Sequence, residues 1–225
     1  EFEQLLTFSV TPIGLTTEEA GTFFSESPTI SPDGTLRFRP AANAFGSFEF
    51  EIVLTDNGPG NATRGDLTSS LPTTLTIDVR PKNDPPQIDP AVDRLEYTML
   101  EDGSVRIPVN GDNTNPGLLD VFLVGPGREG SDVTPGGNQT LELATPIPVS
   151  SASGGTVTAI RDDNGNVTAL RYQPKIDFVG DDSFIYTVID DGVTVNVGTG
   201  GTVINDPRVN ANTVSFRVLP VNDAP

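Results

Sequence analysis

The sequence predicts an all-β chain that folds as two consecutive β-sandwiches. Three observations support this prediction: short apolar runs alternate with polar residues, 23 Gly and 20 Pro punctuate the 225 residues, and one strand pattern occurs twice. Hydrophobic residues make up 35 % of the chain, enough to build a core in each of two modest domains. The apolar residues show no sustained helical period, so we expect at most one helical turn, at Thr16–Gly21.

The first copy of the pattern begins with an expected strand at Leu5–Val10. The residues Ser31-Pro32-Asp33-Gly34 are typical of a tight turn, and they precede a short apolar run at Leu36–Pro40. In the next strand, apolar side chains occupy every second position, which is the period expected when one face of a strand packs inward. The core residues predicted for this copy are Phe38, Phe50, Ile52 and Leu54.

The second copy is recognised by direct alignment with the first. The match runs without a gap over three expected elements and resumes after a few extra residues in the second copy. The aligned segments are Leu36–Pro40 with Leu170–Pro174, Asp56–Gly58 with Asp190–Gly192, and Leu75–Pro86 with Val214–Pro225. Insertions belong in surface connections, so the extra residues agree with a repeat whose strands are shared.

Two further strands are expected in the second copy, at Thr156–Ile160 and Val167–Tyr172. The segment Asp163-Asn164-Gly165-Asn166 lies between them, and Asn-Gly supplies the positive φ angles that a tight hairpin turn requires. The core residues predicted for this copy are Tyr172, Phe184, Tyr186 and Val188.

A proline-rich segment separates the two copies. Pro81–Pro90 contains four prolines among polar residues, which favours an extended, stiff linker over a central strand. We therefore predict two domains, residues 1–84 and residues 85–225.

The two domains are expected to differ at their beginnings. Leu95–Val109 leaves room for an opening strand pair in the second domain, whereas the first domain starts directly at Leu5–Val10, which resembles Leu118–Val124. The first domain is thus predicted to lack its first strand or strands.

Charge and composition limit the classes of function. The 31 acidic and 13 basic residues give a net charge of −18, which repels nucleic acid and anionic membranes and concentrates cations such as Ca²⁺. The chain has no Cys, His or Trp, which excludes zinc sites and Ser-His-Asp or Cys-His catalysis within it. Apolar runs fall short of the ~20 residues of a membrane helix. We expect an extracellular or cell-surface protein whose targeting segments lie outside this sequence, with no direct membrane insertion.

Four short motifs occur in a characteristic order: Leu100–Ser104, Phe178–Tyr186, Asp190–Gly192 and Pro220–Pro225. In order and spacing they resemble the cadherin-like tandem repeats of very large bacterial surface and secreted proteins. The resemblance covers nearly all of the second copy and the later two thirds of the first. It implies two tandem Greek-key immunoglobulin/cadherin-like β-sandwiches, with Ca²⁺ bound at the junctions between repeats.

The resemblance also implies two sets of Ca²⁺ ligands. The set at the far end of the second domain is Glu101, Asp181, Asp182, Asn222 and Asp223. The set at the junction between the domains is Asn83, Asp84, Asp112 and Asp190. The first domain has Ser47-Phe48 where the second has Asp181-Asp182. Each of these acids is also a typical turn residue, so a purely structural role stays open for every one of them.

An extracellular structural or adhesion module explains the acidity, the repeats and the linker together, and it is not an enzyme. Its expected partners are other repeats of the same protein and a cell-surface protein or polysaccharide. A carbohydrate-binding module is the alternative, although the absence of Trp and the presence of only three Tyr leave few platforms for sugar stacking. A glycosidase would need two carboxylates about 5 to 10 Å apart in a cleft, and these acids fall in turns.

Overall fold

The computed structural model describes residues 5–58, 69–92, 94–112, 115–125, 139–196 and 201–222. These residues are almost entirely β-strand and turn, with one short helix, so the predicted all-β fold class is confirmed. Contacts divide the chain into two compact units; unit 1 extends to Pro81 and unit 2 begins at Lys82.

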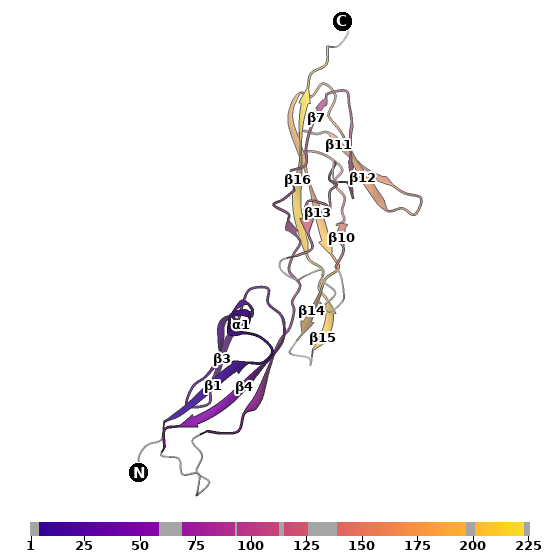
Figure 1. Ribbon diagram of the computed structural model, residues 1–225. Helices are drawn as coiled ribbons and strands as arrows, with labels where there is room; N and C mark the ends of the chain where they lie inside the picture. The colour runs from indigo at the N-terminus through magenta and orange to yellow at the C-terminus, as the bar shows by residue number, and fades with distance from the viewer. Residues whose placement is uncertain are drawn as a thin grey trace. The chain divides into compact units, whose positions relative to one another are not determined.

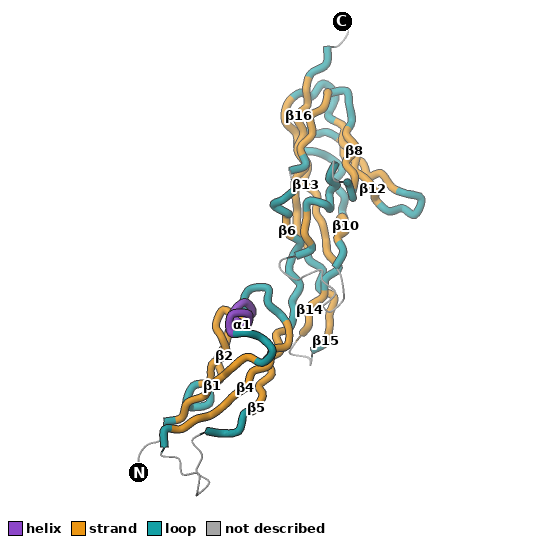
Figure 2. Tube along the Cα trace, in the orientation of Figure 1, coloured by secondary structure: helices purple, strands orange, loops and turns teal. Residues whose placement is uncertain are grey.

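Unit 1 contains two small sheets and the helix (Figure 1). One sheet has the strand order β1-β4-β5, and the other is the pair β2-β3; all of their pairings are antiparallel. The elements are β1 (Leu6–Pro12), α1 (Thr17–Phe23), β2 (Phe24–Ile30), β3 (Leu36–Pro40), β4 (Gly46–Asp56) and β5 (Thr73–Val79). Figure 2 shows β1, β4 and β5 running side by side.

An aromatic cluster joins the two sheets of unit 1. Phe24 of β2 packs edge to face against Phe48 and Phe50 of β4, at centroid distances of 5.1 and 5.7 Å, and Ile77 of β5 completes the buried set. The helix is longer than the single turn expected. It begins after a capping box in which Thr16 and Glu19 exchange hydrogen bonds, so two of its first N–H groups are satisfied.

Unit 2 contains two larger sheets that enclose the main core. The four-stranded sheet has the order β10-β13-β16-β7 and the three-stranded sheet the order β11-β12-β8, with two short pairs, β6-β9 and β14-β15, beside them. The strands are β6 (Gln87–Ile88), β7 (Glu96–Leu100), β8 (Val105–Pro108), β9 (Phe122–Leu123), β10 (Leu141–Leu143), β11 (Thr156–Arg161), β12 (Val167–Gln173), β13 (Gly180–Asp190), β14 (Val193–Asn196), β15 (Thr202–Asn205) and β16 (Val209–Leu219).

The turn chemistry read from the sequence is present in both units. Gly34, between β2 and β3, has φ 87°, and Gly165, between β11 and β12, also has φ 87°. A side chain is strained in this region and glycine is not, so these two glycines permit the two hairpins.

The strand ladders of the two units have the same register. Gly46 lies opposite Val79 in unit 1, and the aligned Gly180 lies opposite Val218 in unit 2. At the other end of the long strands, Leu6 of β1 lies opposite Asp56, and Leu141 of β10 lies opposite Asp190. Strand β1 therefore corresponds to β10. The expectation that Leu5–Val10 corresponds to Leu118–Val124 is wrong, because the latter segment runs through a turn into β9.

Burial confirms the predicted core of unit 2 and only part of that of unit 1. Tyr172, Phe184, Tyr186 and Val188 are all buried. In unit 1 Phe50 is buried, Ile52 and Leu54 are half-buried, and Phe38 is 38 % exposed. The prediction of a buried Phe38 is wrong because one face of the small sheet β2-β3 is incompletely covered.

Candidate functional site

The linker residue Asn83 lies in a buried polar network of unit 2. Its amide nitrogen donates to Asp190 Oδ1 at 2.7 Å and to the carbonyl of Asp206 at 2.8 Å. Its backbone N–H donates to Thr194 Oγ1 at 2.9 Å, and its side-chain oxygen accepts from Gln139 Nε2 at 2.8 Å. The side chain is 2 % exposed, so these bonds replace water completely. Asn83 is thereby fixed within unit 2.

A glycine makes room for this arrangement. Gly192 follows β13, and a Cβ added to it would overlap the side-chain amide of Asn83. Its N–H donates to Asp190 Oδ1 at 2.9 Å, the same oxygen that Asn83 contacts. In unit 1 the aligned Asp56 accepts the N–H of Gly58 at 2.7 Å in the same way. The Asp-x-Gly motif thus forms the same turn in both units, as turn chemistry predicts.

The network around Asp190 contains buried oxygens that lack a hydrogen-bond partner. Asp190 is 3 % exposed; Oδ1 accepts three donors, while Oδ2 is buried and unpaired. Gln139 Oε1 is also buried and unpaired. An unpaired buried oxygen is unfavourable unless a cation, a donor or an ordered water completes it.

A guanidinium lies beside the same acids. Arg208 donates to Asp206 Oδ2 at 2.7 Å, and that oxygen also accepts from Thr194 Oγ1 at 2.6 Å. The hydrogen bonds from Thr194 and Arg208 lower the pKa of Asp206, and Lys82 adds a smaller effect of the same sign. The Asp206 hydrogen bond and nearby Asp190 and Asp84 raise the pKa of Arg208. The protein's own cation therefore neutralises part of this acidic group.

Asp112, the remaining member of the predicted junction set, lies in the turn after β8. Its Oδ1 accepts the N–H of Asn115 at 2.9 Å, as a turn aspartate does. Asp84 follows Asn83 in the linker and is half-buried. The structure thus brings Asn83 and Asp190 into contact, and the charge of Asp84 helps to raise the pKa of Arg208. Asp112 lies in a separate turn.

Asp182 is the centre of a second buried network. Ser151 Oγ and Tyr172 OH both donate to its Oδ2, the latter at 2.6 Å. The N–H groups of Ser153 and Ser183 donate to Oδ1 at 2.8 and 2.7 Å. Two donors on each oxygen fill the acceptor capacity of a carboxylate. A cation could bind Asp182 only by displacing one of these bonds.

The hydrogen bonds outweigh burial in setting the ionisation of this pair. Burial raises the pKa of Asp182, but the bonds from Ser151, Tyr172, Ser153 and Ser183 together hold its pKa below the usual value. Burial and the bond to Asp182 raise the pKa of Tyr172. At neutral pH the pair is therefore a protonated phenol donating to an ionised carboxylate.

The other residues of the predicted far-end set lie in different settings. Asp181 precedes Asp182 on β13, so it points to the opposite, solvent-exposed face of the sheet. Glu101 follows β7 and is 9 % exposed; its Oε1 accepts the N–H of Val221 at 2.7 Å. Asn222 is exposed, and Asp223 lies outside the described residues.

Calcium requires several oxygen ligands at about 2.3 to 2.6 Å. Among the described residues, no group of three or more His, Cys, Asp or Glu side chains is arranged to hold a metal ion. The Asp182 network does not fit such an ion because its oxygens are already saturated. The Asp190 network fits better, since Asp190 Oδ2 and Gln139 Oε1 are buried oxygens without donors.

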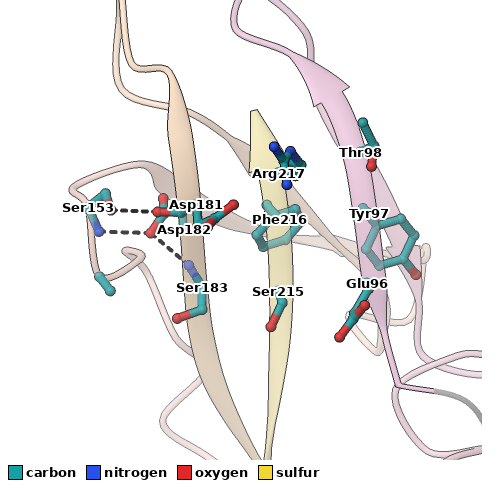
Figure 3. A pocket seen from close by; sticks show the side chains of 11 residues that line it. Glu96, Tyr97, Thr98, Ser153, Asp181, Asp182, Ser183, Ser215, Phe216 and Arg217 are labelled. Carbon is teal, nitrogen blue, oxygen red and sulfur yellow. Dashed lines mark hydrogen bonds between the residues drawn. The ribbon is translucent and has the colours of Figure 1, made fainter. Parts of the chain in front are cut away.

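A polar groove of about 690 Å³ crosses the four-stranded sheet of unit 2 (Figure 3). It spans β13, β16 and β7, whose side chains lie in rows because the paired positions are in register. The principal lining residues are Glu96, Thr98, Ser153, Asp181, Ser215 and Arg217. Tyr97 alternates with Glu96 and Thr98 along β7, so its ring lies on the core side of the sheet. Tyr97 stacks on Phe216 at a centroid distance of 5.9 Å.

Sequence reasoning missed several members of the Asp190 network. Gln139, Thr194 and Asp206 contact Asn83 only because the chain folds back over more than 50 residues. Arg208 contacts Asp190 across 18 residues, without a recognisable motif. Tyr172 was predicted as a core residue only. Its polar role could have been inferred from the fact that Tyr172 and Asp182 change together, since the aligned positions in unit 1 are Phe38 and Phe48.

No family model and no curated protein matches the chain. Among solved structures it is similar to the PcdhgB3 EC1-4 fragment, with 13 % identity and a TM-score of 0.40, covering 97 % of this chain and 41 % of that one. The human Desmocollin-1 ectodomain is 11 % identical with a TM-score of 0.34, and the match covers 98 % of this chain and 34 % of that one. An endo-fucoidan hydrolase of glycoside hydrolase family 107, MfFcnA4_H294Q, is 14 % identical with a TM-score of 0.30, and the match covers 97 % of this chain and 24 % of that one. The chain thus spans less than half of each of these proteins, and likenesses at this level carry no inference about its activity or partners.

Proposed function

We propose that the chain is an extracellular structural or adhesion segment of a larger repeat protein, in which folded units are joined by linkers anchored in the following unit. Its role is to hold neighbouring parts of the protein at a set spacing rather than to catalyse a reaction. Its partners are further repeats and a cell-surface protein or polysaccharide. In the described residues, no helix is long and apolar enough to cross a membrane.

The anchoring of Asn83 carries this proposal. Four hydrogen bonds hold Asn83 within unit 2, and Asn210 Nδ2 donates to the carbonyl of Pro86 at 2.8 Å. The linker from Asn83 to Pro86 is therefore part of unit 2 and adds no flexible length between the units. Transmitting force or setting spacing requires such a short joint, whereas a freely jointed chain would need a Gly/Ser-rich linker.

Paired spin labels test the anchoring. The chain lacks Cys, so Glu49→Cys and Arg171→Cys, both at exposed positions, place one label in each unit. We expect Asn83→Ala to broaden the distribution of label-to-label distances and to lower the melting temperature of unit 2. The aligned but exposed Asn222 provides the matched control, Asn222→Ala, which should leave both measurements unchanged. Equal distributions for the wild type and Asn83→Ala would reject an anchored linker.

Ca²⁺ is proposed as a ligand of the Asp190 network. Asp190 Oδ2 and Gln139 Oε1 supply buried oxygens without donors, and Asp84 adds nearby negative charge. Bound there, Ca²⁺ would attract both Asp190 at the end of β13 and Asp84 in the linker, and so would stabilise the contact between these two segments. The neighbouring guanidinium of Arg208 opposes it electrostatically, so we expect weak binding.

Thermal melting with Ca²⁺ and with a chelator tests this proposal. At about one hundred times its dissociation constant, Ca²⁺ should stabilise unit 2 by about 2.7 kcal/mol. Asp190→Asn keeps an acceptor for Gly192 but removes the charge, so it should abolish the shift, whereas Asp182→Asn should retain it. An unchanged melting temperature in excess chelator would identify all these acids as structural.

The groove on unit 2 favours the alternative, a carbohydrate-binding module. Hydroxyl, carboxylate and guanidinium groups line it, which suits a polyhydroxylated ligand. An oligosaccharide array with the wild type and with Glu96→Ala/Arg217→Ala tests it. Glycan binding by the wild type that the double variant loses would support this function. If the wild type binds no glycan, the carbohydrate-binding alternative is rejected and the structural role stands.

A further inference from the structure

Four outer strand edges in unit 1 have no partner among the described residues of that unit, and two of them, those of β5 and β3, correspond to edges that are paired in unit 2. β5 pairs with β4 along one side, and β3 pairs with β2 along one side. Exposed backbone N–H and C=O groups along such edges accept further strands. The two edges belong to different sheets, so two strands are needed to cover them.

Unit 2 shows what covers the corresponding edges. β16, which aligns with β5, pairs in parallel with β7, so that Arg217 lies opposite Thr98. β12, which aligns with β3, pairs antiparallel with β8, so that Leu170 lies opposite Ile107. β7 and β8 are consecutive strands joined by the turn at Glu101–Ser104, and each pairs with a different sheet. One short segment of chain therefore closes both sheets.

The side chains beneath the uncovered edges of unit 1 are more exposed than their counterparts. Phe38 is 38 % exposed, whereas the aligned Tyr172 is fully buried. The same difference holds at the neighbouring core positions, where the residues of unit 1 are half-buried and those of unit 2 are at most 1 % exposed: Leu36 against Leu170, Leu75 against Val214, and Val79 against Val218. Unit 1 thus has a partly uncovered core at the place where β7 and β8 pack in unit 2.

We propose that unit 1 is a receptor for a two-stranded segment of the β7–β8 type. Its first strand pairs in parallel with the outer edge of β5, and its second strand pairs antiparallel with β3. The partner is recognised by apolar side chains at alternate positions, as Met99 and Ile107 provide in unit 2, where both are buried. Main-chain hydrogen bonds supply affinity and the alternating pockets supply specificity.

A second copy of the chain is a poor donor of this segment. Its own β7 and β8 are already paired with β16 and β12, so donation would open its unit 2. Each copy also carries a net charge of −18, which opposes self-association. The donor is therefore a separate segment of polypeptide with the alternation described.

Register-specific cross-linking tests the proposal on the full chain. The probe is a synthetic peptide with the sequence of Leu95–Val109. From the register of unit 2, Asp78 of β5 should lie beside Thr98 of the peptide, and Thr76 beside Glu96. Asp78→Cys and Thr76→Cys are made singly, both at exposed positions, and each is mixed with peptides carrying Thr98→Cys or Glu96→Cys in oxidised and reduced glutathione.

The matched pairs should form the mixed disulfide at least about tenfold faster than the crossed pairs, because two residues of slip separate the sulfurs by about 7 Å more. Hydrogen exchange should slow in β3 as well as β5, since the peptide covers both edges. A peptide with Met99→Asp and Ile107→Asp should fail to cross-link. The thermal transition of unit 1, which contains both cysteine positions, is monitored to show that the variants are folded.

Three results would overturn the proposal. The first is equal cross-linking in matched and crossed pairs. The second is no cross-linking with the free peptide or with the same segment fused ahead of Glu1 through a Gly/Ser linker. The third is rapid disulfide formation between two copies of the Thr76→Cys chain in the absence of peptide, which would assign the edge to self-association.

Discussion

At the scale of single residues, the clearest feature is a pair of positions that change together between the two units. In unit 2, Tyr172 donates to Asp182 inside the core, and in unit 1 the aligned residues are Phe38 and Phe48. Replacing both partners of a buried hydrogen bond by apolar groups is nearly neutral, whereas replacing one leaves the other unsatisfied. The sequence contains both matched combinations and neither mismatched one.

A double-mutant cycle at this pair should reveal the coupling. We expect Tyr172→Phe to lower the unfolding free energy of unit 2 by about 1 to 2 kcal/mol, and Asp182→Ala by about 2 to 3 kcal/mol, because each removes part of a charge-assisted network. In the Asp182→Ala background, Tyr172→Phe should have almost no effect. Denaturant unfolding measures all four proteins, and additive effects would mean that the two side chains do not interact energetically.

The pH dependence of unit 2 follows from the lowered pKa of Asp182. A carboxyl whose pKa is lower in the folded state stabilises the fold above its unfolded value, about 3.9, and this contribution is lost as the pH falls through the folded pKa. Between about pH 7 and about pH 2, the melting temperature of unit 2 should therefore fall more steeply in the wild type than in Asp182→Asn. If the plots of melting temperature against pH are parallel for the two proteins, other carboxylates cause the loss of stability in acid.

At the scale of elements, the turn after β13 determines where the linker binds. Gly192→Ala should displace Asn83 and lower the melting temperature of unit 2, because the added methyl group would overlap the Asn83 amide. A loss of about 2 to 4 kcal/mol is expected, since several buried polar groups lose their partners. Gly21→Ala is the control: a Cβ there meets open space within α1, and alanine favours a helix. Equal effects of the two substitutions would contradict steric displacement.

The two core phenylalanines of unit 1 should respond differently to truncation. Phe50 is 3 % exposed and contacts Phe24, so Phe50→Ala should destabilise unit 1 by about 3 to 5 kcal/mol. Phe38 is 38 % exposed, and Phe38→Ala should destabilise it by about 1 kcal/mol. With the β7–β8 peptide bound, the second value should rise, because Phe38 would then be covered. Thermal melts of both variants with and without peptide measure these differences.

Alternation along strands predicts most of the elements, whereas the candidate site residues were selected by short motifs. The apolar alternation of β13 predicts that Phe184, Tyr186 and Val188 face the core, and all three are buried. Asp182 belongs to the same inward-facing set, two residues before Phe184, so the pattern itself places it in the core. Its assignment as a metal ligand came from a motif instead. Arg208 and Asp206 could not be predicted, because no short-range pattern links them to Asn83.

At the scale of the whole molecule, the two units should unfold separately. Within the described residues, unit 1 has a small aromatic core and unpaired edges at β3 and β5, whereas unit 2 encloses a large cluster of buried side chains. We expect two calorimetric transitions, with unit 1 melting first. Added salt should raise both transition temperatures by screening repulsion within a chain of net charge −18. A single transition insensitive to Asn83→Ala would indicate one cooperative unit.

The matched pairs of Tyr172 with Asp182 and Phe38 with Phe48 bear on how neighbouring repeats fold without mixing. Adjacent repeats with similar strands are prone to misassembly, in which a strand of one is captured by the other during synthesis. If β4 replaced β13, Phe48 would face Tyr172, and the buried hydroxyl would lose its acceptor at a penalty of about 1 to 3 kcal/mol. If β13 replaced β4, the Asp182 carboxylate would enter an aromatic cluster with no donor for it. Each unit is therefore incompatible with the other's central strand, and a single cross-sheet pair favours correct folding of the two units.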